Sequence, residues 1–294
     1  MHEKSKGIII ISLCYVTAFA ICALVFVLLA HYTSINHLVA ILLADVAATI
    51  VIYLFGLLFR TASMYDPYWS VQTIMIYMGL LIYYKNFNLG TFIVFVVLLL
   101  YSVRLTGNFL KGFDSLSYED WRYKMLKEKS GKLYQLVNFF GICMFPTLVV
   151  YLASIPVFLY ARMGSFSYLD LIGAGVTVVG IAIELFADVE MKYFIKNRKD
   201  RSEVINFGIW KYSRHPNYLG EIIIWFGLGM MFIISHIEYW YFFAGAVVNL
   251  LMFLFISIPM EEKHLLSYKP DYSLYQKTTS PLLLLPKRKL TKEK

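Results

Sequence analysis

The sequence GIWKYSRHPNYLGE, residues 208–221, joins a basic polar run to an apolar segment. Pro216 suits the first turn of a helix, because it has no backbone N–H to leave unsatisfied and its φ is already near the helical value. We therefore expect a helix that begins near Asn217, with Ser213 or His215 as its cap. Polar side chains this close to hydrocarbon are costly unless they face a protein interior or a ligand. The stretch thus predicts a ligand site at the mouth of a membrane segment.

The composition is that of a polytopic membrane protein. Of 294 residues, 59% are hydrophobic and only 16% are charged, whereas soluble chains carry roughly a quarter charged residues. A helix needs about 20 apolar residues to cross a membrane. The candidate spans are residues 7–29, 38–59, 70–84, 89–110, 133–161, 168–190, 217–235 and 237–259. The third is short and the fifth is long, so we predict an all-α membrane bundle of about eight transmembrane helices, between seven and nine.

The basic residues are distributed unevenly about these spans. We predict that both termini are cytoplasmic: the outer loops then carry only Lys85 and Arg162, Arg104 lies within a span, and the inner side carries 24 of the 27 Lys and Arg residues. This distribution follows the positive-inside rule. The net charge of +8 therefore indicates orientation and attraction to anionic lipid headgroups, and not nucleic-acid binding.

Polar side chains that could carry chemistry gather on or just inside the predicted cytoplasmic boundary. They are Asp66, Arg104, Asn108, Glu119, Glu184, Asp188, Arg214, Asn217, Glu221 and Glu261. The outer half of the spans is nearly apolar, except for Asp45, which is protonated, paired to another helix or part of a site. These residues predict a polar cavity that opens to the cytosol beneath an apolar outer half. A cavity of this kind suits a charged, water-soluble cofactor and a lipophilic substrate. No metal site is expected, because Cys14, Cys22 and Cys143 lie within spans and lack metal-ligand spacing.

Three of these acids allow both a structural and a functional interpretation. Asp66 precedes Pro67 at the entry to the third span, where its carboxylate could cap the helix or line a pocket. Glu184 and Asp188 are four residues apart in the last turns of the sixth span, where acids oppose the helix dipole. These two acids could pair with Arg104 or accept hydrogen bonds from a ligand.

Several motifs together carry a resemblance to a known superfamily. Residues 213–221 (SRHPNYLGE) resemble the C-terminal signature of the steroid 5-alpha-reductase and sterol-reductase superfamily. With residues 66–71 (DPYWSV), 104–108 (RLTGN) and 119–123 (EDWRY), the chain is similar to the largely bacterial, uncharacterised branch of that superfamily. The resemblance implies N-terminal transmembrane helices at 1–62 and a membrane catalytic domain at 63–286. It also favours a bacterial inner membrane over the endoplasmic reticulum. The run of basic residues at 287–294 predicts a disordered tail.

The resemblance implies an all-helical reductase that binds NADPH in a cavity facing the cytosol. Asn217 and Glu221 match an Asn and a Glu that contact the nucleotide in the steroid reductases. Asp188 matches a cofactor-binding acid on the preceding helix, and Glu184 stands one turn back, where that family has Asn. The other cofactor-binding candidates are Arg214, His215, Tyr218, Arg104 and Asn108.

The resemblance also implies the chemistry. Tyr101 matches the tyrosine that polarises the substrate carbonyl, and Asp66 lies near the acid that assists it. The expected reaction transfers hydride from NADPH to the β-carbon of a lipophilic, steroid- or isoprenoid-like enone, while a hydroxyl donor stabilises charge on the carbonyl oxygen. Residues 260–264 (MEEKH) replace the histidine-rich segment of the steroid reductases, which does not favour a steroid as the substrate.

Two other functions fit parts of the sequence. Isoprenylcysteine carboxyl methyltransferases and phospholipid methyltransferases also carry an Arg-His-Pro-x-Tyr-x-Gly stretch and use S-adenosylmethionine, and Glu261 and Glu262 resemble those enzymes. Residues 120–123 and Glu221 favour the reductase. A third interpretation is a non-enzymatic, lipid-binding membrane scaffold. The expected partners are a lipophilic small molecule and membrane lipid, with neither nucleic acid nor an obligatory protein partner.

Overall fold

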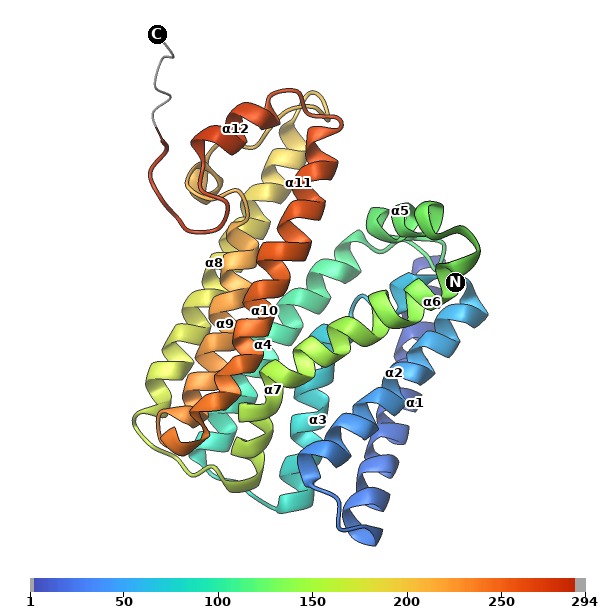
Figure 1. Ribbon diagram of the computed structural model, residues 1–294, viewed down its shortest axis with the longest axis vertical. Helices are drawn as coiled ribbons and strands as arrows, with labels where there is room; N and C mark the ends of the chain where they lie inside the picture. Colours follow the sequence, from blue (N-terminus) through green and yellow to red (C-terminus); the bar gives the residue numbers. More distant parts are fainter. Residues whose placement is uncertain (1–2, 289–294) are drawn as a thin grey trace. The chain divides into compact units, whose positions relative to one another are not determined.

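The computed structural model describes residues 3–288, which are almost entirely helical and contain no β-strand beyond one isolated bridge (Figure 1). Within this range, seven stretches are long and apolar enough to cross a membrane by length and composition. They are Glu3–Tyr32, His37–Phe59, Leu89–Gly112, Trp121–Met163, Asp170–Asn197, Pro216–Ile233 and Ile237–Leu266. The predicted all-α, multi-pass membrane bundle is confirmed. The predicted basic tail lies, from residue 289 on, outside the described residues. The chain divides into two compact units, Met1–Ser167 and Tyr168–Lys294.

The N-terminal unit is built from long helices that run in alternate directions along the chain (Figure 1). Its main elements are α1 (Glu3–Tyr32), α2 (His37–Phe59), η1 (Ala62–Met64), α3 (Tyr68–Tyr84), α4 (Leu89–Gly112), α5 (Trp121–Ser130), η2 (Gly131–Leu133), α6 (Tyr134–Val137), η3 (Asn138–Met144) and α7 (Phe145–Met163). The last three form one continuous pass, in which η3 is a π-helical turn.

The link between α2 and α3 turns back into the N-terminal unit. Met64 is buried, and its carbonyl accepts a hydrogen bond of 3.0 Å from Tyr15, which lies near the middle of α1. Tyr68, the first residue of α3, donates to Asp45, which lies 14 residues, or about 21 Å, before Phe59 at the end of α2. Irregular backbone at membrane depth is tolerated where it is buried in protein. Because α3 starts inside the unit, it has only 17 residues and is not among the seven stretches.

The C-terminal unit has three long passes, with η4 and α12 at one end (Figure 1). Its elements are α8 (Asp170–Asn197), η4 (Gly208–Lys211), α9 (Pro216–Ile233), η5 (Ile237–Phe243), α10 (Ala244–Met252), η6 (Phe253–Ser257), α11 (Ile258–Leu266) and α12 (Tyr272–Thr278). A second π-helical turn, η6, lies within the pass formed by α10 and α11.

Helices α8 and α9 pack closely because glycines lie where their backbones meet. A Cβ atom added at Gly180 would lie 2.7 Å from the carbonyl oxygen of Gly220, and one added at Gly220 would lie 2.7 Å from that of Gly180. Gly173 and Gly227 make a second such contact farther along the pair. Small residues let membrane helices approach in this way. Gly220 therefore fixes the position of α9 against α8.

Candidate functional site

Residues 213–221, called the signature stretch below, lead into α9 as the sequence predicts. The helix starts at Pro216, and His215 occupies the cap position without a side-chain capping bond. The Ser213 hydroxyl accepts a hydrogen bond of 3.2 Å from the His215 backbone N–H and donates one of 2.7 Å to the carbonyl of Leu282. His215 is thus the cap by position, while Ser213 ties the stretch to the C-terminal segment.

Arg214 and His215 meet at one carboxylate. Glu262 Oε1 lies 2.5 Å from Arg214 Nε and 3.1 Å from His215 Nε2, and Glu262 Oε2 accepts a hydrogen bond of 2.6 Å from Gln276. Arg214 Nη1 also donates to the carbonyls of Gln276 and Thr279, at 2.7 and 2.5 Å. These contacts give the arginine and histidine of the signature a structural role. Cofactor contact by either one stays a prediction.

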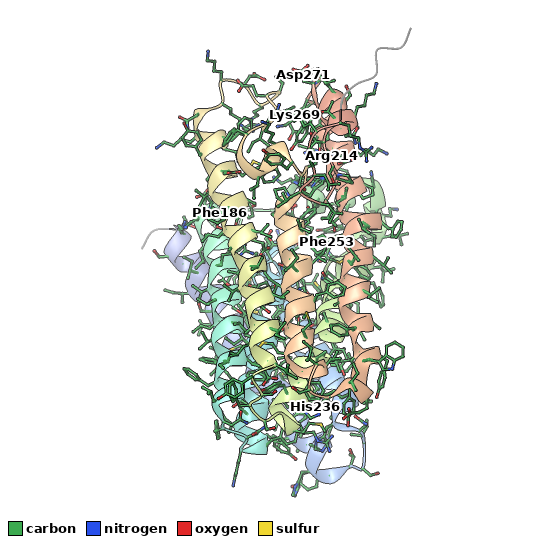
Figure 2. The ribbon with its side chains drawn as sticks, turned by 90° about the vertical axis from the view of Figure 1, so that its left-hand side faces the viewer. Phe186, Arg214, His236, Phe253, Lys269 and Asp271 are labelled. Carbon is green, nitrogen blue, oxygen red and sulfur yellow. The ribbon has the colours of Figure 1, made fainter. Side chains whose placement is uncertain are left out.

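An aromatic stack continues from this carboxylate cluster along α9. The rings of His215 and Tyr218 are nearly parallel, with centroids 5.2 Å apart, and Tyr218 also contacts Phe253 at 4.7 Å. Phe253 is the first residue of the π-helical turn η6, and such turns are frequent at functional sites. Figure 2 shows Arg214 toward the end of the unit that carries Lys269 and Asp271, with Phe253 nearer its middle and His236 at the opposite end.

Two carboxylates and one amide gather around the contact of α8 with α9. Glu184 is buried and packs directly against Gly220. Glu221, the residue that follows Gly220, is also buried. Asn217 is half-buried and shares a face of α9 with Glu221, whose Oε1 accepts a hydrogen bond of 2.7 Å from the Trp225 indole. The structure therefore brings together three of the residues predicted to bind a cofactor.

Asp188 falls close to the same place by the register of the helix pair. Gly180 lies against Ile224, and Glu184 lies against Gly220, so four residues along α8 match four residues back along α9. One further turn brings Asp188 level with Pro216 at the start of α9. The four acid and amide residues of the C-terminal unit that are predicted to bind the cofactor, Glu184, Asp188, Asn217 and Glu221, thus lie within about two turns.

The loop before α9 is held by residues that the sequence did not mark as important. Gly208 has a φ of +56°, a conformation that favours glycine, and the Glu190 carboxylate accepts a hydrogen bond of 2.9 Å from the Ile209 backbone N–H. Tyr275 donates to the carbonyls of Trp210 and Ser213. No local spacing reveals these partners, because they lie far along the chain or on another helix.

Asp66 does not cap α3, so the capping interpretation is wrong. Pro67 occupies the cap position and makes no side-chain bond. The Asp66 carboxylate instead accepts a hydrogen bond from the hydroxyl of Tyr123, because residues 114–123 cover the link between α2 and α3. Burial raises the pKa of Asp66 to about 6, although the Tyr123 hydrogen bond opposes part of this rise. The carboxyl group therefore keeps its proton to higher pH than an exposed aspartate.

Of the three alternatives given for Asp45, the structure shows the second: its side chain is paired to another helix. Its carboxylate is fully buried and accepts hydrogen bonds from Tyr68, at 2.8 Å, and from Gln72 on the first turns of α3. Tyr65 is also buried, and its hydroxyl lies 2.8 Å from that of Thr147 on α7. This polar network holds the link between α2 and α3 inside the unit.

Tyr101, Arg104 and Asn108 share one face of α4. At about 100° per residue they fall within about 60° of one another. Ser102 lies at least about 100° around the helix from each of these three residues. Its hydroxyl donates a hydrogen bond of 2.6 Å to the Ser70 carbonyl of α3. The three residues therefore lie on the side of α4 that is turned away from α3. Tyr101 is buried, whereas Arg104 and Asn108 are half-buried.

The predicted residues are divided between the two units. Tyr101, Asp66, Arg104 and Asn108 belong to the N-terminal unit, as does Glu119, and the other candidates for cofactor binding belong to the C-terminal unit. Within residues 3–288, no group of three or more His, Cys, Asp or Glu side chains is placed to hold a metal ion.

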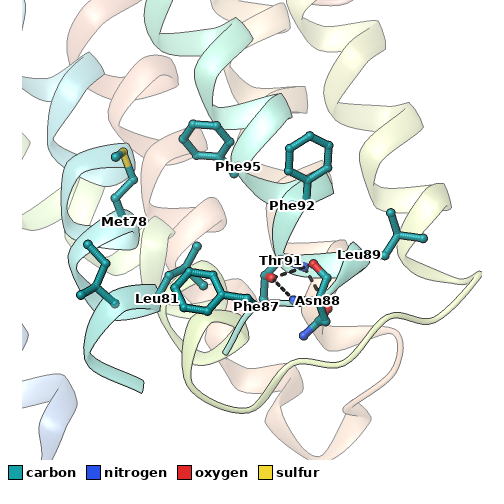
Figure 3. Close-up of a pocket in the computed structure, with 9 residues that line it drawn as sticks. Met78, Leu81, Phe87, Asn88, Leu89, Thr91, Phe92 and Phe95 are labelled. Atoms are coloured by element: carbon teal, nitrogen blue, oxygen red, sulfur yellow. Dashed lines mark hydrogen bonds between the residues drawn. The ribbon is translucent and has the colours of Figure 1, made fainter. Parts of the chain in front are cut away.

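An apolar hollow of about 560 Å³ lies between α3 and α4 (Figure 3). It is lined by Met78, Leu81, Ile82, Phe87, Asn88, Leu89, Thr91, Phe92 and Phe95. Asn88 and Thr91 bond to each other in a capping box at the start of α4. The hollow suits a hydrocarbon group, and it contains none of the predicted site residues.

The contacts of Glu262 with Arg214 and His215 allow a prediction about the stability of the protein. Glu262→Ala leaves the guanidinium of Arg214, whose side chain is only 10% exposed, without its charge partner. Removing one member of a buried ion pair typically costs about 3–5 kcal/mol, so we expect a marked fall in melting temperature. The measurement is thermal unfolding of the purified protein in detergent. Glu128→Ala is the control, because Glu128 is exposed on α5; equal melting temperatures for the two variants would contradict the structural role of Glu262.

The fold and the sequence comparisons identify the class of protein. The fold is that of a multi-pass, all-α membrane protein with a cluster of buried acids at one helix contact. A family model described as "protein of unknown function (DUF1295)" matches residues 52–279. Because that match covers more than half of the chain, the chain belongs to this family.

One curated relative is an uncharacterised protein of Schizosaccharomyces pombe, C594.04c, which is 25% identical over 192 residues. The match covers 56% of this chain and 56% of the relative, so the chain spans about half the length of that protein. No solved structure matches the chain at a significant level.

Proposed function

We propose that the protein is a membrane-embedded, NADPH-dependent reductase of a carbon–carbon double bond in a lipophilic enone. The observation that carries the proposal is the gathering of Glu184, Asn217 and Glu221 at the contact of α8 with α9. These residues belong to, or pack against, the stretch that resembles the signature of the steroid and sterol reductases. The activity itself, the cofactor and the superfamily are parts of this proposal.

The chemistry of these side chains fits a dinucleotide. Carboxylates accept hydrogen bonds from ribose hydroxyls, and the Asn217 amide can both donate to and accept from a carboxamide. Exposed cations at the end of α8 and just beyond it, Lys196, Lys199 and Arg201, supply positive charge that attracts phosphate groups. Glu184, Asp188, Asn217 and Glu221 are therefore the residues proposed to hold the cofactor.

Bound NADPH would supply a hydride. The side chain proposed to act on the substrate is Tyr101, whose hydroxyl donates a hydrogen bond to the carbonyl oxygen of the enone. As the β-carbon gains hydride, the electron pair of the double bond moves toward that oxygen, and the resulting enolate then takes a proton at the α-carbon. A hydroxyl donor stabilises the developing charge most in a site without water. Asp66 is proposed to assist the tyrosine.

The first test of the proposal is ligand-dependent stability. NADPH at 100 times its dissociation constant should stabilise the wild-type protein by about 2.7 kcal/mol, which thermal unfolding in detergent would detect. Glu221→Ala should lose this stabilisation and remain folded. Glu128→Ala, which removes an exposed acid, should keep it. Stabilisation by S-adenosylmethionine and not by NADPH would overturn the reductase proposal.

A second candidate is a methyltransferase that uses S-adenosylmethionine. The observation in its favour is the contact of Glu262 with Arg214 and His215, at 2.5 and 3.1 Å. That contact joins the two motifs which resemble the isoprenylcysteine and phospholipid methyltransferases. The same ligand comparison distinguishes the two enzymes, and stabilisation by neither ligand would favour the lipid-binding scaffold.

A further inference from the structure

A polybasic surface lies where the chain enters the pass formed by α6, η3 and α7. It consists of Lys124, Lys127, Lys129 and Lys132, all exposed on α5 and η2. No side chain of α5 is fully buried, and the helix packs through Tyr123 and Leu126 against the cluster of Ala62, Tyr134 and Ile142, so packing does not account for its exposed lysines. Within residues 3–288, none of the four lysines forms an ion pair with a carboxylate of the protein.

The acids that precede this surface are occupied elsewhere. Asp120 accepts hydrogen bonds from the backbone N–H and the Nε of Arg122, at 2.9 and 2.7 Å, which caps α5. Glu119 accepts a hydrogen bond of 3.4 Å from Tyr134. Only Glu128 adds a negative charge within α5 itself. The lysine charges are therefore largely uncancelled toward the outside of the protein.

Exposed apolar side chains follow the lysines immediately. Leu133, Leu136 and Phe140 are 62%, 57% and 61% exposed, at the beginning of the pass formed by α6, η3 and α7. Side chains of this kind are stable in hydrocarbon, and neighbouring lysines extend their charged ends to the level of the headgroups. The Lys127 ammonium group also lies 5.6 Å from the centre of the Tyr134 ring. This contact places a cation between the lysines and the exposed apolar side chains.

From the charge and its position we infer that the polybasic surface binds the anionic headgroups of phospholipids in the leaflet that α6 enters. Clusters of four to eight Lys or Arg residues next to a membrane helix typically bind such lipids. Zwitterionic lipids carry no net charge to match the four lysines, so the surface should select phosphatidylglycerol over phosphatidylcholine. This binding would hold α5 against the membrane surface, and it does not depend on the proposed enzymatic activity.

The test is native mass spectrometry of the detergent-purified protein with phosphatidylglycerol and phosphatidylcholine. The wild type should retain phosphatidylglycerol preferentially. The variant Lys124→Gln/Lys127→Gln/Lys129→Gln/Lys132→Gln should bind it at least about tenfold more weakly, with unchanged affinity for phosphatidylcholine. Because the four side chains are exposed, its melting temperature should equal that of the wild type.

A matched control removes the same charge from the C-terminal unit. The variant Lys211→Gln/Lys263→Gln/Lys277→Gln/Arg288→Gln replaces four exposed basic residues and should keep its affinity for phosphatidylglycerol. Equal losses in both variants would show a general charge effect and overturn the inference. So would effective competition by glycerol 1-phosphate at the same concentration as the lipid, since that result would indicate a small-anion site instead of a lipid surface.

Discussion

Gly220→Leu is expected to abolish folding of the C-terminal unit. A Cβ atom at this position would lie 2.7 Å from the carbonyl oxygen of Gly180 and 3.0 Å from the backbone nitrogen of Glu184. Backbone atoms of a helix cannot move aside as a flexible side chain can, so α8 and α9 must separate along their whole contact. Overpacking alone typically costs about 1–3 kcal/mol, and separation of the pair adds the loss of its other contacts.

The measurement is the yield of monodisperse protein and its melting temperature after purification in detergent. Gly175→Leu is the matched control, because a Cβ atom at Gly175 on the same α8 would meet nothing within 4 Å. We expect the control to purify like the wild type and Gly220→Leu to aggregate. A Gly220→Leu protein that melts at the wild-type temperature would contradict the close packing of the two helices.

Tyr101→Phe is expected to lower turnover by about 10²–10³-fold, the usual effect of losing one donor to a developing oxyanion. The substitution keeps the ring of this fully buried residue and removes only the hydroxyl proposed to bind the carbonyl. Stabilisation by NADPH should therefore survive. The measurement is the steady-state rate of enone reduction at pH 8, well above the pKa of about 6 of Asp66.

Tyr77→Phe provides the comparison for Tyr101. Tyr77 is equally buried, and its hydroxyl donates a hydrogen bond of 3.0 Å to the carbonyl of Thr91 within the same unit. Its loss should affect stability and leave turnover close to that of the wild type. If Tyr101→Phe retains wild-type turnover on a confirmed substrate, the role passes to another hydroxyl, and Tyr65 and Tyr68 are the next to test.

The architecture could be predicted from the sequence because a membrane leaves few alternatives. Backbone groups in hydrocarbon must be satisfied within the segment, so long apolar stretches identify helices directly. The path between α2 and α3 could not be predicted. Hydropathy does not show that the chain turns back until Tyr68 reaches Asp45, and the pairing of these two residues depends on packing across 23 positions of sequence.

In the candidate site too, contacts between neighbours on one helix could be predicted, whereas contacts between residues far apart in the sequence could not. The helical period predicts that Asn217 and Glu221 share a face, because residues four apart are neighbours on a helix. It cannot predict that Glu262, 47 positions after His215, is the carboxylate that meets the signature. Nor could it show that Asp66 bonds to Tyr123 instead of capping α3, since both arrangements suit an acid before a proline.

The most direct test of the proposed function follows a labelled hydride. Purified protein would be incubated with NADPH deuterated at the transferable position of the nicotinamide ring and with lipophilic enones, a 4-en-3-one steroid and a polyisoprenoid enone. The proposal predicts a saturated product that carries deuterium at the β-carbon, and no such product from the Tyr101→Phe or Glu221→Ala protein beyond a trace. Failure to transfer deuterium to either enone, together with transfer of a labelled methyl group from S-adenosylmethionine to a lipid, would contradict it.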